Sequence, residues 1–214
     1  MYEYVTDAEV SEYRSYCAEV LTELRDRLLD KDINTQFILV GSGARNMVMR
    51  DGNGPFDLDY NLRILDMPDT YWNNLRSLKD LVRNELNYIV RHTWFSDGKD
   101  STSVITAILR NGAGVELKFD IAIIAENDEG NLCRLIHDKR VWPERFYWNE
   151  APKSHDVKAK ADVIKKKGKW GDVRDKYYDL KNMYLERQDY DHPSFVCYIE
   201  AVNAIYQKCN KKKK

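Results

Sequence analysis

The sequence predicts an α+β fold, in which a mixed sheet flanked by helices is followed by a unit made of helices. Strand-type alternation of apolar and polar residues is confined to the part of the chain before residue 140. Helical spacing precedes and interrupts these strands, and only helical patterns follow them. We therefore expect a first domain at residues 1–140 and a helical C-terminal domain at residues 141–214.

The composition is that of an ordinary globular protein and excludes some classes of function. The formal net charge is -1, so the molecule as a whole does not attract nucleic acid or an anionic membrane. The four cysteines form no C-x-x-C pair, which argues against a disulfide scaffold or a zinc site. Residues 1–4 lack the basic and apolar regions expected of a signal peptide, and no uncharged apolar run approaches the ~20 residues needed to span a bilayer. We expect a cytoplasmic protein without a membrane partner.

The expected elements follow from periodicity and from turn signals. A capping box at Thr6-x-x-Glu9 starts a helix, and Asn111 to Gly114 form the turn of a hairpin. The expected strands are 37–40, 56–65, 102–109, 115–124 and 132–136. The expected helices are 7–30, 44–49, 69–91, 155–167, 171–186 and 193–208. The aromatic-rich segment 141–154 is expected to be irregular.

Two carboxylates on the strand 56–65 are the centre of the functional interpretation. Asp57 and Asp59 are two residues apart, so on a strand they project from the same face, about 6–7 Å apart along the chain. Oxygen ligands of this kind suit Mg²⁺, which removes the repulsion between them. Alone, the pattern is also compatible with the solvated face of an amphipathic strand.

Two neighbouring features support a phosphate and metal site. Gly41, Ser42 and Gly43 lie between an apolar strand and a short helix, where glycine backbone can approach a phosphate. Asp120 interrupts the apolar run Phe119 to Ile124, where an unpaired carboxylate is costly to bury. Asp120 is therefore either the partner of a basic residue such as Lys118 or a third carboxylate of the metal site.

Taken together, these residues resemble the signature of the polymerase-beta-type nucleotidyltransferase superfamily. A strand ends at Gly41-Ser42, the acidic pair Asp57 and Asp59 lies on a second strand, and Asp120 lies on a later strand. The resemblance covers about residues 37–124. One departure is Phe56, which precedes the first aspartate where the family often has glycine or a small hydroxyl residue.

The resemblance implies a nucleotidyltransferase that uses two Mg²⁺ ions. Asp57, Asp59 and Asp120 would be both the metal ligands and the catalytic residues. The outer phosphates of a nucleoside triphosphate such as ATP would rest against Gly41, Ser42 and Gly43. A nucleoside monophosphate would pass to the hydroxyl of a small molecule or an RNA, and pyrophosphate would leave.

Basic side chains are needed to hold a triphosphate. Arg45 and Lys118 are candidates within the first domain. The densest group of lysines, which is also explained by a solvated helix face, comprises Lys158, Lys160, Lys165, Lys166, Lys167 and Lys169.

The alternative function is a catalytically inactive nucleotidyltransferase fold that serves as a binding or regulatory module, such as a toxin–antitoxin component. Retention of all three aspartates favours the enzyme.

Overall fold

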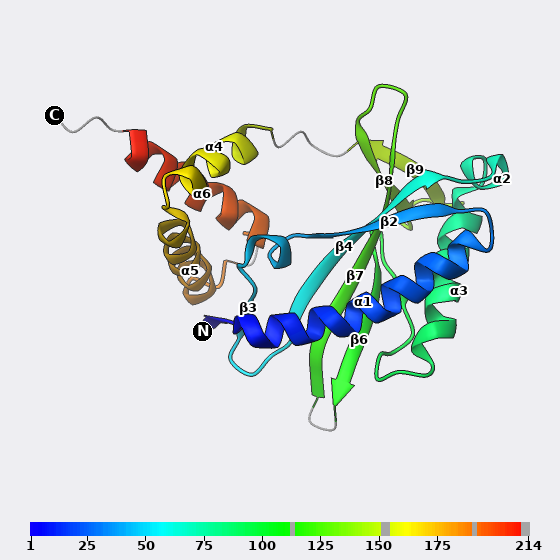
Figure 1. Ribbon diagram of the computed structural model, residues 1–214, viewed down its shortest axis with the longest axis horizontal. Coiled ribbons are helices and arrows are strands. Elements are labelled where there is room, and N and C mark those ends of the chain that lie inside the picture. Colours follow the sequence, from blue (N-terminus) through cyan, green and yellow to red (C-terminus); the bar gives the residue numbers. More distant parts are fainter. Residues whose placement is uncertain (112–113, 151–154, 190–191, 211–214) are drawn as a thin grey trace. The chain divides into compact units, whose positions relative to one another are not determined.

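The computed structural model describes residues 1–111, 114–150, 155–189 and 192–210. By their internal contacts, the described residues form two compact units, Tyr4–Ala151 and the combination of Met1–Glu3 with Pro152–Lys214. The predicted α+β class is confirmed, with strands β2–β9 in the first unit and helices α4–α6 in the second (Figure 1). None of the described helices has the length and apolar character needed to cross a membrane.

The larger unit is built on a seven-stranded mixed sheet. Strands β2, β4, β7, β6 and β5 are neighbours in that order, while β8 pairs with β7 and β9 pairs with β8. β4 and β7 run parallel, and the other pairs within the sheet are antiparallel. The bounds of these strands are β2 Asn34–Val40, β4 Phe56–Asp66, β5 Lys99–Asp100, β6 Ile105–Asn111, β7 Gly114–Glu126, β8 Leu132–Asp138 and β9 Arg145–Glu150. The short strands β1 (Tyr2–Tyr4) and β3 (Met49–Asp51) lie outside the sheet.

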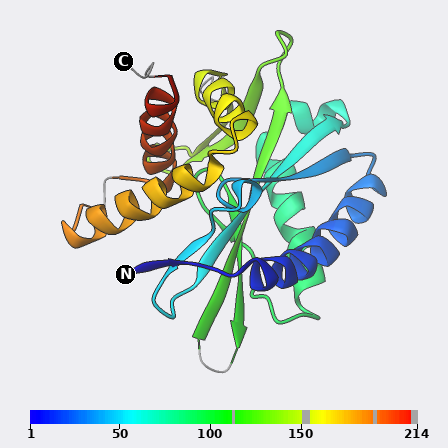
Figure 2. The same ribbon diagram turned by 60° about the vertical axis from the view of Figure 1, so that its left-hand side comes forward.

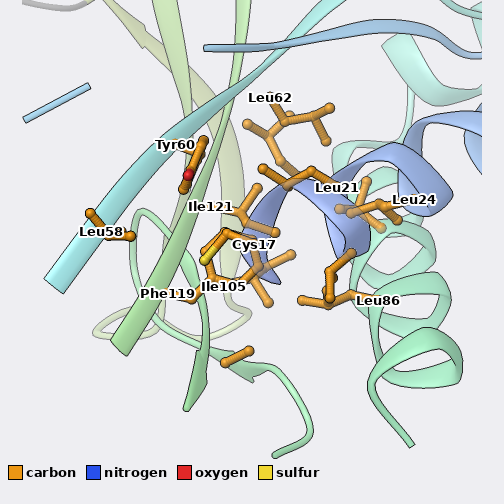
Figure 3. Packing of buried hydrophobic residues seen from close by; sticks show 14 of the residues in the cluster. Cys17, Leu21, Leu24, Leu58, Tyr60, Leu62, Leu86, Ile105, Phe119 and Ile121 are labelled. Atoms are coloured by element: carbon orange, nitrogen blue, oxygen red, sulfur yellow. The ribbon is translucent and has the colours of Figure 1, made fainter. Parts of the chain in front are cut away.

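Two long helices cover one face of this sheet (Figures 1 and 2). They are α1 (Asp7–Leu29), which Thr6 caps as expected, and α3 (Leu75–Val90). Figure 3 shows Leu21 and Leu24 of α1 and Leu86 of α3 packed toward Leu62 and Ile121 of the sheet. The apolar side chains of β4 and β7 are therefore buried beneath the helices, and the alternate side chains project to the opposite face.

Three local expectations are corrected by the structure. The helix expected at 44–49 is a single 3₁₀ turn, η1 (Gly43–Arg45), because Asn46 adopts φ 56° and ends it. The helix expected at 69–91 is divided into α2 (Asp69–Trp72) and α3 by Asn74, whose side chain caps α3. The segment 141–154, which was expected to be irregular, contains β9. This strand pairs with β8 at the edge of the sheet, and its sequence does not alternate between apolar and polar residues.

The smaller unit contains α4 (His155–Lys166), α5 (Trp170–Glu186) and α6 (Ser194–Asn210). Residues Met1–Glu3 also belong to this unit. Asn182 of α5 accepts a hydrogen bond from the Tyr2 amide (2.7 Å) and donates one to the Tyr2 carbonyl (3.1 Å). The buried side chains include Ile164, Val173, Tyr177, Cys197, Ala201 and Val202. These residues give the helices a core of their own.

Candidate active site

The parallel pairing of β4 with β7 brings the predicted carboxylates together. Asp59 is directly opposite Asp120, and Asp57 is opposite Lys118. Neighbouring strands are about 4.8 Å apart, so the Asp59 and Asp120 backbones are adjacent although the two residues are far apart in the chain. Leu58 and Tyr60, which alternate with the aspartates, are buried on the helix-covered face. The carboxylates therefore lie on the opposite face of the sheet, here called the carboxylate face.

The electrostatics of Asp59 show the cost of placing these charges together. Its pKa is raised from 3.8 to about 6, first by burial and then by the negative charges of Asp120 and Asp57. Arg134 and Arg45 act in the opposite direction. A nearby cation would lower the energy of the ionised carboxylate. Such an environment is expected of a metal or phosphate site.

Asp120 has a different set of partners. Burial raises its pKa, whereas a hydrogen bond from Thr106 and the charge of Lys118 lower it. The Thr106 Oγ1–H donates to Asp120 Oδ1 at 2.5 Å. The Lys118 ammonium lies 4.0 Å from Asp57 Oδ1, and both side chains are about half exposed, so this ion pair is weak. Lys118 is thus beside the carboxylates, but its ion pair is with Asp57.

Gly41 explains why strand β2 ends at Val40. Val40 is paired with Asp59, and the next residue, Gly41, turns away with φ +64°. A Cβ at Gly41 would lie 2.3 Å from Asp59 Oδ2. Both the positive φ and the close approach require glycine here. Gly43 is buried against Leu39 and Leu58, so the turn is anchored in the sheet.

Ser42 and Arg45 lie in this turn but differ in what they contribute. The Ser42 carbonyl accepts hydrogen bonds from the Arg45 and Met47 amides, while its hydroxyl makes no capping hydrogen bond. Arg45 is near enough to lower the pKa of Asp59. Because η1 is one 3₁₀ turn, the helix-dipole contribution expected from a longer helix is small.

Replacing Gly41 with alanine is expected to remove activity at a moderate cost in stability. The added methyl group would displace the Asp59 carboxylate and force a positive φ on a non-glycine residue, which costs about 1–3 kcal/mol. Thermal unfolding and nucleotide turnover would be measured together. Gly52, which has φ +54° but no atom near its missing Cβ, is the matched control. Turnover in the Gly41→Ala variant as high as in the Gly52→Ala variant would contradict this account.

Two further residues of the carboxylate face were not identified from the sequence, Thr106 and Arg134. Each is a polar residue within an apolar strand, Ile105–Leu109 and Leu132–Ile136 respectively, which is the available signal. Their relevance depends on strand pairing: Thr106 is opposite Asp120, and Arg134 is opposite Ile124. Neither register follows from local sequence.

The remaining predicted basic residues belong to the helical unit. Lys160 donates a hydrogen bond to Asn203, Lys167 donates to the Cys209 carbonyl, and Lys169 pairs with Asp172. Lys165 lies over the Trp170 ring. These interactions account for four of the six lysines within their own unit.

The metal assignment stays a prediction. In the part of the chain that the structure describes, no three His, Cys, Asp or Glu side chains are gathered closely enough to bind a metal ion. The donor set nevertheless fits Mg²⁺, because it consists of carboxylates, and burial together with repulsion from Asp120 and Asp57 raises the pKa of Asp59.

One cavity of the molecule is not lined by these carboxylates. It has a volume of about 1090 Å³ and is lined by α1, the end of α3 and residues of β6 and β7, including Tyr13, Trp94 and Glu116. The carboxylate face remains the candidate site, because buried like charges meet a glycine turn there.

The fold is the nucleotidyltransferase-type fold that the sequence predicted. The sequence matches no family profile and no curated protein. The similarity is to solved structures of CD-NTases at low sequence identity, so it establishes the fold.

Three solved structures illustrate the similarity. CdnC from E. coli, solved with ATP, is 20% identical, with a TM-score of 0.57, over 94% of this chain and 61% of that one. The Vibrio cholerae di-nucleotide cyclase DncV, in a variant complexed with ATP and GTP, is 14% identical, with a TM-score of 0.58, over 98% and 57%. DncV with the linear intermediate 5' pppA(3',5')pG is 11% identical, with a TM-score of 0.57, over 79% and 59%. The chain thus spans about three fifths of these neighbours.

Proposed function

We propose that this chain is a metal-dependent nucleotidyltransferase that transfers a nucleoside monophosphate from a nucleoside triphosphate to a hydroxyl group and releases pyrophosphate. The observation that carries the proposal is the register of Asp59 opposite Asp120, with the Gly41 backbone against the Asp59 carboxylate. Three separate segments of the chain meet there. A solvated strand face does not require such an arrangement.

Asp57, Asp59 and Asp120 are the residues that would hold Mg²⁺. The bound ions would supply charge neutralisation and polarisation of the phosphate. The chain's own contribution is to position the reactants. The backbone of Gly41 to Gly43 and the Ser42 hydroxyl would bind the outer phosphates, and Arg45 would add positive charge.

In the reaction, a bond forms between the acceptor oxygen and the α-phosphorus as the bond from the α-phosphorus to the bridging oxygen breaks. Pyrophosphate leaves with that oxygen. Asp120 would receive the proton of the acceptor hydroxyl. Positioning and charge stabilisation provide most of the acceleration, as in other phosphoryl transfers.

The acceptor that we favour is the ribose hydroxyl of a second nucleotide, which belongs to the small-molecule class. Support comes from a structural neighbour, DncV, which is described as a cyclic AMP-GMP synthase and was solved with a linear dinucleotide intermediate. The net charge of -1 also disfavours a large RNA acceptor.

The test is a calorimetric titration with each of the four nucleoside triphosphates, with and without Mg²⁺, followed by assay of pyrophosphate release for single nucleotides and for pairs. We expect nucleotide binding that depends on Mg²⁺ and is lost in the Asp57→Ala variant. We also expect release of pyrophosphate that is greatest with the preferred nucleotide or pair of nucleotides. Asp128→Ala, which removes an exposed carboxylate from the turn after β7, is the control. Failure of all nucleotides to bind at millimolar concentration would reject the enzyme and favour the regulatory module.

A further inference from the structure

A threonine hydroxyl is held against one of the site carboxylates. Thr106 lies on β6 opposite Asp120 of β7, and its Oγ1–H donates to Asp120 Oδ1 at 2.5 Å. The adjacent residues of β6, Ile105 and Ala107, are fully buried in the core. Strand alternation therefore directs the Thr106 side chain to the carboxylate face.

The chemistry of this contact suits an orienting role. A hydroxyl donating to an ionised carboxylate makes a short, charge-assisted hydrogen bond. Threonine is β-branched and has restricted χ1 freedom, so its hydroxyl direction is well defined on a strand. The bond occupies one lone pair of Oδ1, and the remaining lone pairs of the Asp120 carboxylate stay free for other ligands.

The sheet contains a second threonine that lacks such a contact. Thr35 of β2 is 5% exposed, and its Oγ1 has no hydrogen-bond partner among the described residues. The two threonines occupy the same sheet, but only the hydroxyl of Thr106 meets a carboxylate. Thr35 therefore provides a control for the loss of a threonine hydroxyl from this sheet.

We propose that Thr106 is a positioning residue, whose hydroxyl fixes the orientation of the Asp120 carboxylate so that Asp120 and Asp59 can share a divalent cation. Thr106 acts through Asp120 and does not touch the substrate. This role rests on the proposed nucleotidyltransferase function. It assigns to β6 a part in the site that the aspartates alone do not reveal.

The test compares Thr106→Val, Thr106→Ser and Thr35→Val. Valine keeps the shape of threonine and removes the hydroxyl, whereas serine keeps the hydroxyl. Calorimetric titration with Mn²⁺ in the absence of nucleotide should show affinity about 10- to 100-fold weaker in Thr106→Val, the range typical of residues that orient metal ligands. Thr106→Ser should recover most of the affinity, and Thr35→Val should bind as the wild type does.

Steady-state kinetics provide a second reading. In Thr106→Val, kcat at fixed Mg²⁺ should fall about 10- to 100-fold, with a smaller change in KM for the nucleotide. Mn²⁺ affinity unchanged by Thr106→Val would overturn the role of Thr106 and leave the proposed function intact. Absence of Mn²⁺ binding by the wild-type chain would overturn the role of Thr106 whatever the assays of turnover show. Absence of nucleotide turnover with normal Mn²⁺ binding would count against the proposed function alone.

Discussion

Replacement of Asp59 by asparagine is expected to abolish turnover while making the protein more stable at pH 8. The loss of turnover, about a thousandfold or more, follows from removal of a proposed metal ligand that would support charge stabilisation at the reacting phosphate. The gain in stability follows from the raised pKa of Asp59, because the ionised carboxylate is held beside Asp120 and Asp57 in a half-buried position. Functional residues often carry such a cost.

The sign of the pH dependence follows from proton uptake. The pKa of Asp59 is about 6 in the folded chain and 3.8 ordinarily, so the folded state binds more protons between these values. The contribution of Asp59 to the free energy of unfolding therefore decreases as pH rises from about 4 to 6. At pH 8 the destabilisation by its ionised carboxylate is fully present. The neutral side chain of the Asp59→Asn variant resembles the protonated form of Asp59. The variant should therefore be about 1–2 kcal/mol more stable than the wild type at pH 8 and indistinguishable from it at pH 4.

Urea unfolding of both proteins at pH 4, 6 and 8 measures this difference. Asp128→Asn, at an exposed position in the turn after β7, is the matched control and should change stability little at any pH. Mg²⁺ should stabilise the wild type more than the Asp59→Asn variant, because a ligand that binds only the folded state raises its stability. Equal stability of the wild type and the Asp59→Asn variant at pH 8 would refute the proposed repulsion at the site.

The largest expected loss of stability comes from replacement of His137 by alanine. His137 is 6% exposed and lies between two carboxylates, with Nδ1 2.6 Å from Asp100 Oδ2 and Nε2 2.9 Å from Glu144 Oε2. Each ring nitrogen that carries a proton can donate to the carboxylate that it faces. The ring also stacks on Phe146 of β9, with centroids 4.0 Å apart. Its removal leaves one largely buried carboxylate with fewer partners and a void beside β9.

Asp100 shows how tightly these charges are coupled. Burial raises its pKa, but hydrogen bonds from Lys79 and His137 outweigh burial and leave the pKa below the ordinary value. The Lys79 ammonium, almost fully buried, is 2.6 Å from Asp100 Oδ1. Removing one partner from a buried ionic cluster costs about 3–5 kcal/mol, and we expect this loss for His137→Ala.

Urea unfolding at pH 7 tests the His137→Ala variant against His92→Ala, in which the replaced histidine is exposed at the end of α3. We expect His92→Ala to stay within about 0.5 kcal/mol of the wild type. Because the pKa of Asp100 is lowered, its stabilising contribution is present above the ordinary pKa of 3.8 and is lost as pH falls through the folded-state value. A cost below about 1 kcal/mol for His137→Ala would show that the cluster is not structurally important.

Local sequence determined the main elements of this protein. The alternation from Phe56 to Leu65 predicts β4, and helical spacing with the Thr6 cap predicts α1. Local sequence also indicated Asp57, Asp59, Gly41 and Asp120 as candidate site residues, because polar or flexible residues there interrupt patterns that are otherwise apolar. These are properties of neighbouring residues, and a residue's neighbours in the chain are enough to specify them.

The tertiary structure decided which of these residues meet. The pairing of Asp59 with Asp120 and of Asp120 with Thr106 depends on strand register across separate segments, where a shift of one residue would reverse every side chain. The environment of His137 likewise combines β5, β8 and the residue before β9. Such contacts arise because burying the apolar faces beneath α1 and α3 selects one register, and the selected register places the polar residues together on the opposite face.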